Sequence, residues 1–270
     1  MPLAAVIQLT STSDTAANLA QAEALIRQAA SYGATFVATP EATPYLGPHD
    51  RKVALAEPLD GPTNAHFAAL ARELQIELLL GSTAERLDDQ RAYNTSLLYG
   101  ADGSLKAFYR KIHLFDVDLA RSGGVSFLES ARTAPGEDVV VADTALGRLG
   151  MSVCYDLRVP ELYRRATDQG ATVLAVPSAF TLMTGKDHWH VLLRARAIET
   201  QCWLLAPAQY GAHDDAGLRR SYGHSLIIDP WGTIVAECGD APGIALAEID
   251  PGRVAAVRAQ IPVGSNRRLC

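Results

Sequence analysis

The stretch MSVCYDLRVPELYRR, residues 151–165, places Cys154 where an apolar run ends and a charged helical pattern is about to begin. A free cysteine usually packs in a core, so the thiol by itself indicates no chemistry. Pro160 follows shortly and suits the first position of a new helix. A side chain on such a strand-to-helix turn is displayed at the top of a sheet, as some nucleophiles are. Cys154 is therefore a candidate nucleophile, with core packing as the alternative.

A nucleophilic thiol needs another group that lowers its pKa or removes its proton. A helix that begins at Pro160 lies too far along the chain for its dipole to lower the pKa of the thiol. Cys–His pairing is a common solution, but none of the seven histidines stands in a setting that singles it out. His188 and His190 are two residues apart in a helical stretch, so they face different sides and make a poor metal pair. We predict no metal site.

Two charged residues at the edges of apolar runs fit the chemistry better. Glu41 ends the run ATFVATPE, at the carboxyl end of a predicted strand, where α/β enzymes place their sites. Lys111 stands in the aromatic and aliphatic run LKAFYRKIHLFDVD, although a lysine normally extends to solvent. The alternative for Glu41 is a solvated loop glutamate, and the alternative for Lys111 is a surface lysine. Together with Cys154 they supply a carboxylate base, a cationic oxyanion donor and a thiol, which suffice for acyl transfer.

Composition and charge exclude several classes of protein. A net charge of −6 and the absence of long Lys/Arg clusters argue against nucleic acid as a partner. The N-terminus lacks a basic region, and the longest apolar run, residues 171–183, is too short to span a bilayer. Four scattered cysteines form neither a disulfide framework nor a zinc motif. We expect a cytoplasmic protein without a membrane segment.

Short Val-, Leu- and Ile-rich runs alternate with amphipathic segments almost from end to end, which is typical of an α/β fold. No composition shift marks a boundary, so we expect one domain over residues 1–270, built from two similar α/β halves. Strands are predicted at 4–10, 34–41, 77–85, 171–180 and 243–250, hairpins at 93–111, 139–156 and 225–237, and helices at 14–33, 65–75, 160–170, 188–201 and near 251–261, with the apolar run 202–210 between them.

Three motifs in this order resemble those of the nitrilase, or carbon-nitrogen hydrolase, superfamily. They are TPEA around Glu41, YRKIHLFD around Lys111 and GMSVCYDLRVPELYR around Cys154. The resemblance covers essentially the whole chain and implies a four-layer α-β-β-α sandwich, the nitrilase fold.

The same resemblance implies roles for individual residues. Glu41 corresponds to the general base, Lys111 to the oxyanion stabiliser and Cys154 to the nucleophile, while Glu129 in SFLESARTAPG matches an assisting glutamate. The backbone N–H of Tyr155 would complete the oxyanion hole. No cofactor is implied.

Further segments resemble the branch that contains the deaminated-glutathione amidases and the related ω-amidases of α-keto acid amides. In that branch an arginine four residues after the cysteine binds a substrate carboxylate, and Phe and Thr of the following segment line the pocket. The matching residues are Arg158, Phe180 and Thr184. A guanidinium near the nucleophile can bind a carboxylate through two hydrogen bonds, which favours an acidic amide. An ion pair at the helix start is the alternative for Arg158.

The sequence departs from the family pattern in three places. The usual HWE reads HWH, so His190 replaces a glutamate that we expect near the pocket. Leu128 stands where relatives often carry arginine, and the loop DVDLARSGGVS, residues 116–126, looks expanded. These departures leave the three central residues intact and bear on the substrate.

We therefore predict a thiol amidase that converts a small carboxylate-bearing amide to acid and ammonia through a cysteine thioester. An N-carbamoyl amino acid or aliphatic amide hydrolase of the same superfamily is the alternative within the enzyme class. A catalytically idle dimeric scaffold is the alternative outside it. Cys202 and Cys238 are interpreted as structural. The resemblance also implies a homodimer or a higher homo-oligomer.

Overall fold

The computed structural model describes residues 1–118, 126–213 and 219–268. Most of the loop that looks expanded in the sequence, and Cys270, lie outside the described residues. None of the helices in the described parts is long and apolar enough to cross a membrane.

The larger sheet has nine strands among the described residues, in the order β14-β13-β1-β2-β3-β4-β5, with β17 paired to β1 and β8 paired to β4. Its first strand alternates between two cores: Val6 belongs to the cluster between the sheets, and Ile7 to the cluster under the outer helices. Its strands are β1 (Leu3–Leu9), β2 (Phe36–Ala38), β3 (Glu77–Arg86), β4 (Ala92–Tyr99), β5 (Leu105–Arg110), β8 (Thr133–Ala134), β13 (Ala208–Ala212), β14 (Arg220–Tyr222) and β17 (Gly243–Glu248).

A second sheet of six strands has the order β16-β15-β12-β11-β10-β9. Its central strands β10, β11 and β12 are parallel, and its inner members are short apolar runs, as expected for strands that are covered on both faces. Its strands are β9 (Val141–Thr144), β10 (Gly147–Met151), β11 (Val173–Ala175), β12 (Trp203–Ala206), β15 (Leu226–Ile228) and β16 (Ile234–Glu237), and β6 (Asp116–Val117) pairs with β7 (Phe127–Leu128) separately.

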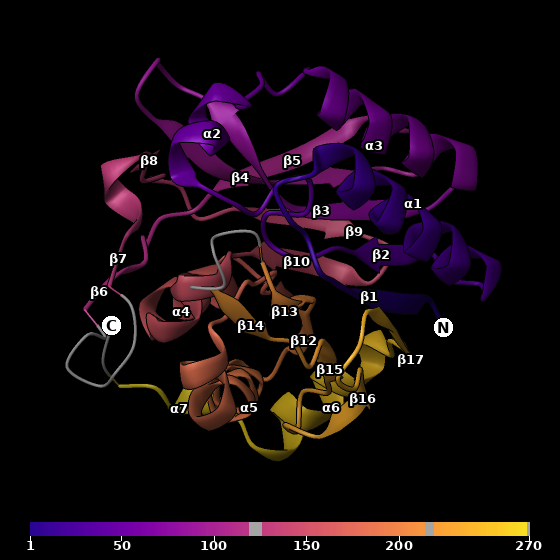
Figure 1. Cartoon of the computed structure of the whole chain (residues 1–270). Helices are drawn as coiled ribbons and strands as arrows, with labels where there is room; N and C mark the ends of the chain where they lie inside the picture. The colour runs from indigo at the N-terminus through magenta and orange to yellow at the C-terminus, as the bar shows by residue number, and fades with distance from the viewer. Residues whose placement is uncertain (119–125, 214–218, 269–270) are drawn as a thin grey trace.

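Helices cover the outer face of each sheet (Figure 1). Helices α1 and α3 pack on the larger sheet, while α4 and α5 pack on the second. Asp14 caps the first helix by accepting a hydrogen bond from the backbone N–H of Ala17, as the sequence pattern indicates. The helices are α1 (Thr15–Ser31), α2 (His49–Ala54), α3 (Pro62–Leu74), α4 (Pro160–Asp168), α5 (Leu182–Thr200), α6 (Pro251–Gln260) and α7 (Val263–Asn266), with 3-10 turns η2 (Glu129–Ala131) and η3 (Cys154–Arg158).

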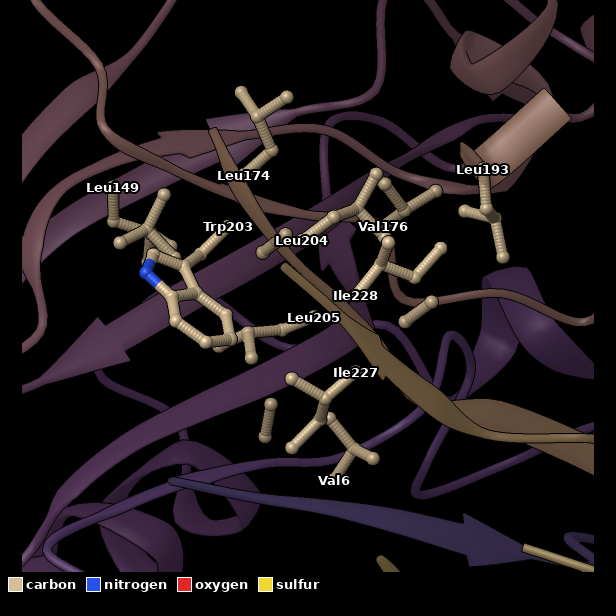
Figure 2. Packing of buried hydrophobic residues seen from close by; sticks show 14 of the residues in the cluster. Val6, Leu149, Leu174, Val176, Leu193, Trp203, Leu204, Leu205, Ile227 and Ile228 are labelled. Atoms are coloured by element: carbon tan, nitrogen blue, oxygen red, sulfur yellow. The ribbon is translucent and has the colours of Figure 1, made fainter. Parts of the chain in front are cut away.

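The main core lies between the two sheets. In Figure 2, Val6 of the larger sheet faces the cluster formed by Leu205 and Ile227 of the second sheet. These side chains are fully buried. The order helix, sheet, sheet, helix confirms the predicted four-layer α-β-β-α arrangement and the α/β class.

The structure adds detail to the predicted elements and corrects the start of one helix. The run 202–210 is split at Pro207 into β12 and β13, which belong to different sheets, because proline cannot donate a ladder hydrogen bond. The predicted strand at 243–250 forms as β17 and joins the larger sheet beside β1. The predicted helix 188–201 begins earlier, at Leu182, and α2 had no clear pattern in the sequence.

Candidate active site

A pocket opens where several strands end, and all eight predicted site residues line it. Glu41 follows β2, Lys111 follows β5 and Cys154 follows β10, so three separate strands bring the central residues together. The lining includes Glu41, Lys111, Glu129, Cys154, Tyr155, Arg158, Phe180 and Thr184, together with His49, Lys52, Asn94, Phe115, Phe127 and Arg219.

Glu41 is held by hydrogen bonds to both carboxylate oxygens. Asn94 donates from its amide Nδ2 to Oε1 at 2.9 Å, and the backbone N–H of Ala179 donates to Oε2 at 2.8 Å. The segment that carries Glu41 crosses β3 at Gly81, where an added Cβ would lie 2.0 Å from the carbonyl oxygen of Thr39. Only glycine allows this close approach. The position of the Glu41 carboxylate therefore depends on the absence of a Cβ at residue 81.

Lys111 lies between two carboxylates in the buried wall of the pocket. Its Nζ donates to Glu41 Oε1 at 3.0 Å and to Glu129 Oε2 at 2.9 Å. The side chain is only 2% exposed. Glu129 also accepts from the backbone N–H of Phe115 at 2.7 Å and from Asn94 Nδ2 at 3.3 Å. This network fixes the ammonium group in one position.

The charges of the network support one another. Burial opposes the charge of Lys111, yet Glu129 and Glu41 hold its pKa well above the ordinary value, so the lysine stays cationic. Burial alone would also raise the pKa of Glu129, but the charges of Lys111 and Lys52 and its hydrogen bonds lower it to about 2. An ammonium that remains charged can stabilise a developing oxyanion, but it does not donate its proton readily.

Cys154 occupies the first position of η3 with a left-handed backbone, φ = 50°. That conformation is costly for a residue with a side chain, and such strain is concentrated at functional sites. Asp156, fully buried, stabilises the turn: it accepts from the backbone N–H of Val153 at 2.8 Å and from the hydroxyl of Tyr109 at 2.7 Å. His113 donates its backbone N–H to the same carboxylate at 2.9 Å.

The environment keeps the Cys154 thiol protonated. Burial raises the pKa of the thiol, and the negative charge of Glu41 raises it further, while Lys111 opposes them in part. The carboxylate of Glu41 lines the same pocket as the thiol. A thiol in this setting would need a base to remove its proton before it could act as a nucleophile.

The predicted substrate-binding residues form another part of the pocket wall. The guanidinium of Arg158 lies over the ring of Phe180, 4.9 Å from its centroid, and its Nη1 is 3.3 Å from His188 Nδ1. Thr184 is 2.8 Å from Thr181 through their hydroxyl oxygens, at the start of α5. Arg158 thus faces the pocket beside aromatic carbon, with its charge available to a ligand.

Sequence reasoning missed several residues that support the site. Asn94 joins Glu41 to Glu129, and its only signal in the sequence is a polar residue inside the apolar strand β4. Asp156 was read only as part of the cysteine motif. Lys52 donates to Thr133 Oγ1 at 3.2 Å and adds a second positive charge near Glu129. Burial lowers the pKa of this lysine, and so does the charge of Lys111.

The two described departures from the family pattern, Leu128 and His190, lie outside the pocket lining. Leu128 is 64% exposed at the end of β7 and is not part of the pocket lining. His190 was expected near the pocket, but its Nε2 instead lies 2.8 Å from Glu237 Oε1, outside the lining. His190 follows Trp189, whose ring packs on Phe180, so it points away from the pocket.

Comparison with known proteins shows which family the chain belongs to. The family model for carbon-nitrogen hydrolases matches residues 3–259. A deaminated glutathione amidase of Synechocystis sp. is 44% identical over 264 residues, covering 96% of each chain. A deaminated glutathione amidase of Homo sapiens is 43% identical over 274 residues, covering 99% of this chain and 83% of the relative.

Comparison with solved structures gives the same result. The NitFhit protein of C. elegans superimposes with a TM-score of 0.92 at 40% identity, over 99% of this chain and 65% of the NitFhit chain. Nit3 of Saccharomyces cerevisiae, described as a member of branch 10 of the nitrilase superfamily, gives a TM-score of 0.87 at 33% identity, over 99% and 97% of the two chains. The pocket with its buried Glu, Lys and Cys side chains therefore lies in a nitrilase fold, and the chain belongs to the carbon-nitrogen hydrolase family.

Proposed function

We propose that this carbon-nitrogen hydrolase is a thiol amidase whose substrate is a small amide that carries a carboxylate. The observation that carries the proposal is the contact set around Lys111, which joins Glu41 and Glu129 in a pocket that also contains Cys154. Hydrolysis of an amide C–N bond is the reaction of the family. The roles of the individual residues follow from their positions.

In the first half of the reaction, Glu41 removes the proton from the thiol while the sulfur attacks the amide carbonyl. A C–S bond forms, and the carbonyl oxygen becomes an oxyanion beside Lys111 and the backbone N–H of Tyr155. Glu41 then protonates the nitrogen, and the C–N bond breaks. The products of this half are a thioester on Cys154 and a free amine, which is ammonia for a primary amide.

In the second half, a water molecule replaces the amine. Glu41 takes its proton as the oxygen attacks the thioester, and the same donors stabilise the second oxyanion. The C–S bond then breaks, and the sulfur recovers a proton from Glu41 as the acid leaves. Glu129 holds Lys111 and does not transfer a proton itself, because its pKa of about 2 keeps it ionised.

Arg158 supports an acidic substrate. Its guanidinium, placed over Phe180 in the pocket wall, can bind a carboxylate through two hydrogen bonds. The names of the relatives point the same way, since deaminated glutathione is an amide that carries carboxylates. We therefore place deaminated glutathione first among candidate substrates, with the ω-amide of an α-keto acid second.

The test is a substrate panel with Cys154→Ala as the blank. The panel contains deaminated glutathione, α-ketoglutaramate, an N-carbamoyl amino acid and a neutral aliphatic amide. Turnover of the amides is followed as the carboxylic acid formed, because a substituted amide releases an amine and not ammonia. Turnover of the carbamoyl compound is followed as the free amino acid. Turnover of the acidic amides that depends on Cys154 is expected. Turnover of only the carbamoyl or neutral compound would refute the substrate, and no turnover of any compound would favour the scaffold alternative.

Three further parts of the proposal concern the state of the protein. We propose that residues 1–270 form one domain, that the chain assembles as a homodimer or larger, and that it works in the cytoplasm without a cofactor. Sedimentation at micromolar concentration tests the assembly. A single species of 28.8 kDa would contradict it.

A further inference from the structure

His190, His224 and Glu237 meet on the surface behind the pocket, although they come from three different segments. His190 lies on α5, His224 precedes β15 and Glu237 ends β16. One oxygen, Glu237 Oε1, lies 2.8 Å from His190 Nε2 and 2.8 Å from His224 Nδ1. The potential ligand atoms of all three residues lie within 4.8 Å of one another.

We propose that these three residues form a binding site for a divalent transition-metal ion, of which zinc fits best. Two imidazoles and one carboxylate are a ligand set that proteins use for Zn²⁺, with the remaining position open to water. The side chains are 28%, 24% and 31% exposed, so an ion can enter from solvent. This site is separate from the proposed amidase chemistry, because none of the three residues lines the pocket.

The surroundings of His224 suit a metal ligand. Its second nitrogen, Nε2, lies 3.3 Å from Asp240 Oδ1. With a metal ion on Nδ1, the proton of the imidazole would stay on Nε2 and face the Asp240 carboxylate. A carboxylate that holds the far nitrogen of a histidine is also the usual support of a metal ligand.

The two imidazoles are oriented before any ion binds. The ring of Tyr222 stacks on His224 with centroids 4.5 Å apart and meets His190 edge-on at 5.9 Å. Tyr222 is itself fixed by Gly185 on α5, where an added Cβ would lie 2.3 Å from the Tyr222 Cβ. The backbone of His224 is left-handed, φ = 56°, and its carbonyl accepts from Trp189 Nε1 at 2.9 Å.

The two distances from Glu237 Oε1 to the imidazole nitrogens, 2.8 Å each, are close to the ligand separations of a zinc complex. Zn–N and Zn–O bonds of about 2.0–2.1 Å in a tetrahedron separate ligand atoms by about 3.3 Å. Glu237 would have to withdraw from each imidazole by about half an ångström, which its partly exposed side chain allows. Metal binding would link α5 to β16 directly behind the ring pair of Trp189 and Phe180.

The experiment is a titration with zinc chloride, followed by calorimetry, in a Cys154→Ala background so that the active-site thiol cannot bind the ion. His190→Gln and Glu237→Gln each remove one ligand and keep a polar side chain of similar size. The control is His66→Ala, because His66 also pairs with a glutamate, Glu23, at 3.2 Å but has no second imidazole described beside it. Circular dichroism melting checks that every variant is folded.

We expect one zinc ion per chain in the background protein and in the His66→Ala variant, with equal Kd. The Kd should rise at least tenfold in His190→Gln and in Glu237→Gln, and zinc should raise the Tm only where it binds. Cobalt(II), substituted for zinc, should give a spectrum without thiolate charge-transfer bands. No saturable binding, or a Kd in both ligand variants that is unchanged from the background protein, would overturn the proposal and leave only a hydrogen-bonded cluster.

Discussion

Replacing Glu129 with glutamine should destabilise the protein and change how its stability depends on pH. The pKa of Glu129 is lowered from 4.5 to about 2, chiefly because Lys111 and Lys52 outweigh the effect of burial. At about 1.4 kcal/mol per pKa unit, this shift corresponds to about 3 kcal/mol of native-state stabilisation at neutral pH. Breaking a buried ion pair from one side typically costs a similar amount.

The sign of the pH effect follows from the lowered pKa. The stabilising contribution of Glu129 is fully present above pH 4.5, its unfolded value, and is lost as the pH falls through about 2. In Glu129→Gln this contribution is missing at every pH. The difference in unfolding free energy between the two proteins should therefore be largest at pH 7 and shrink toward acid.

The assay is urea unfolding of both proteins between pH 7 and pH 3, with kcat measured at pH 7. Glu73→Gln serves as the matched control, because Glu73 also pairs with a cationic side chain, Arg27, but is 59% exposed, where such pairs contribute little. We expect a lower kcat as well, since Lys111 loses a partner that holds it under the oxyanion. A difference in unfolding free energy that stays constant with pH, or equals that of the control, would refute the electrostatic argument.

Three other substitutions test separate parts of the structure. Gly81→Ala places a Cβ 2.0 Å from Thr39 O and should destabilise the fold by at least about 3 kcal/mol, whereas Gly264→Ala, with open space around it, should not; equal melting temperatures would contradict the close approach. Arg158→Ala should lower kcat/KM for acidic amides by about tenfold to a hundredfold and spare neutral ones, and a uniform loss would remove the arginine from carboxylate binding. Glu41→Gln should abolish turnover and yet lower the pKa of the Cys154 thiol, because the carboxylate charge raises it; thiolate absorbance, measured against Cys154→Ala, would rise at lower pH in the variant, and an unchanged titration would show that the two groups are uncoupled.

The central site could be predicted because each of its residues interrupts a local pattern. Glu41, Lys111 and Cys154 stand where apolar runs end, and strand ends in an α/β sheet converge on one edge. Their order also matched a known family, which supplied Glu129. The alternation of strand and helix patterns predicted the α/β class and the two halves, and the resemblance to the family supplied the four layers.

Contacts between distant segments could not be predicted in this way. Asn94 and Asp156 act through partners 35 to 53 residues away, and no local pattern reveals which carboxylate or amide they will meet. His190 was expected near the pocket because of its place in a motif, but neighbouring positions in a helix face different sides, and His190 contacts Glu237 instead. The same limit applies to the split at Pro207, where one apolar run serves two sheets.

The pairing of β1 with β17 has a consequence for how the chain acquires its structure. Val6 lies opposite Ala245 of the antiparallel strand β17, and the parallel partner β13 is also some two hundred residues away in sequence. Contacts of such long separation form slowly, because a large loop must close before they add stability. Until the ribosome has synthesised Glu248, β1 presents an open apolar edge of the kind that recruits foreign strands. Shortened chains that end before Gly243 should therefore aggregate, however complete their pocket residues are, and the risk during synthesis lasts until β17 has been made.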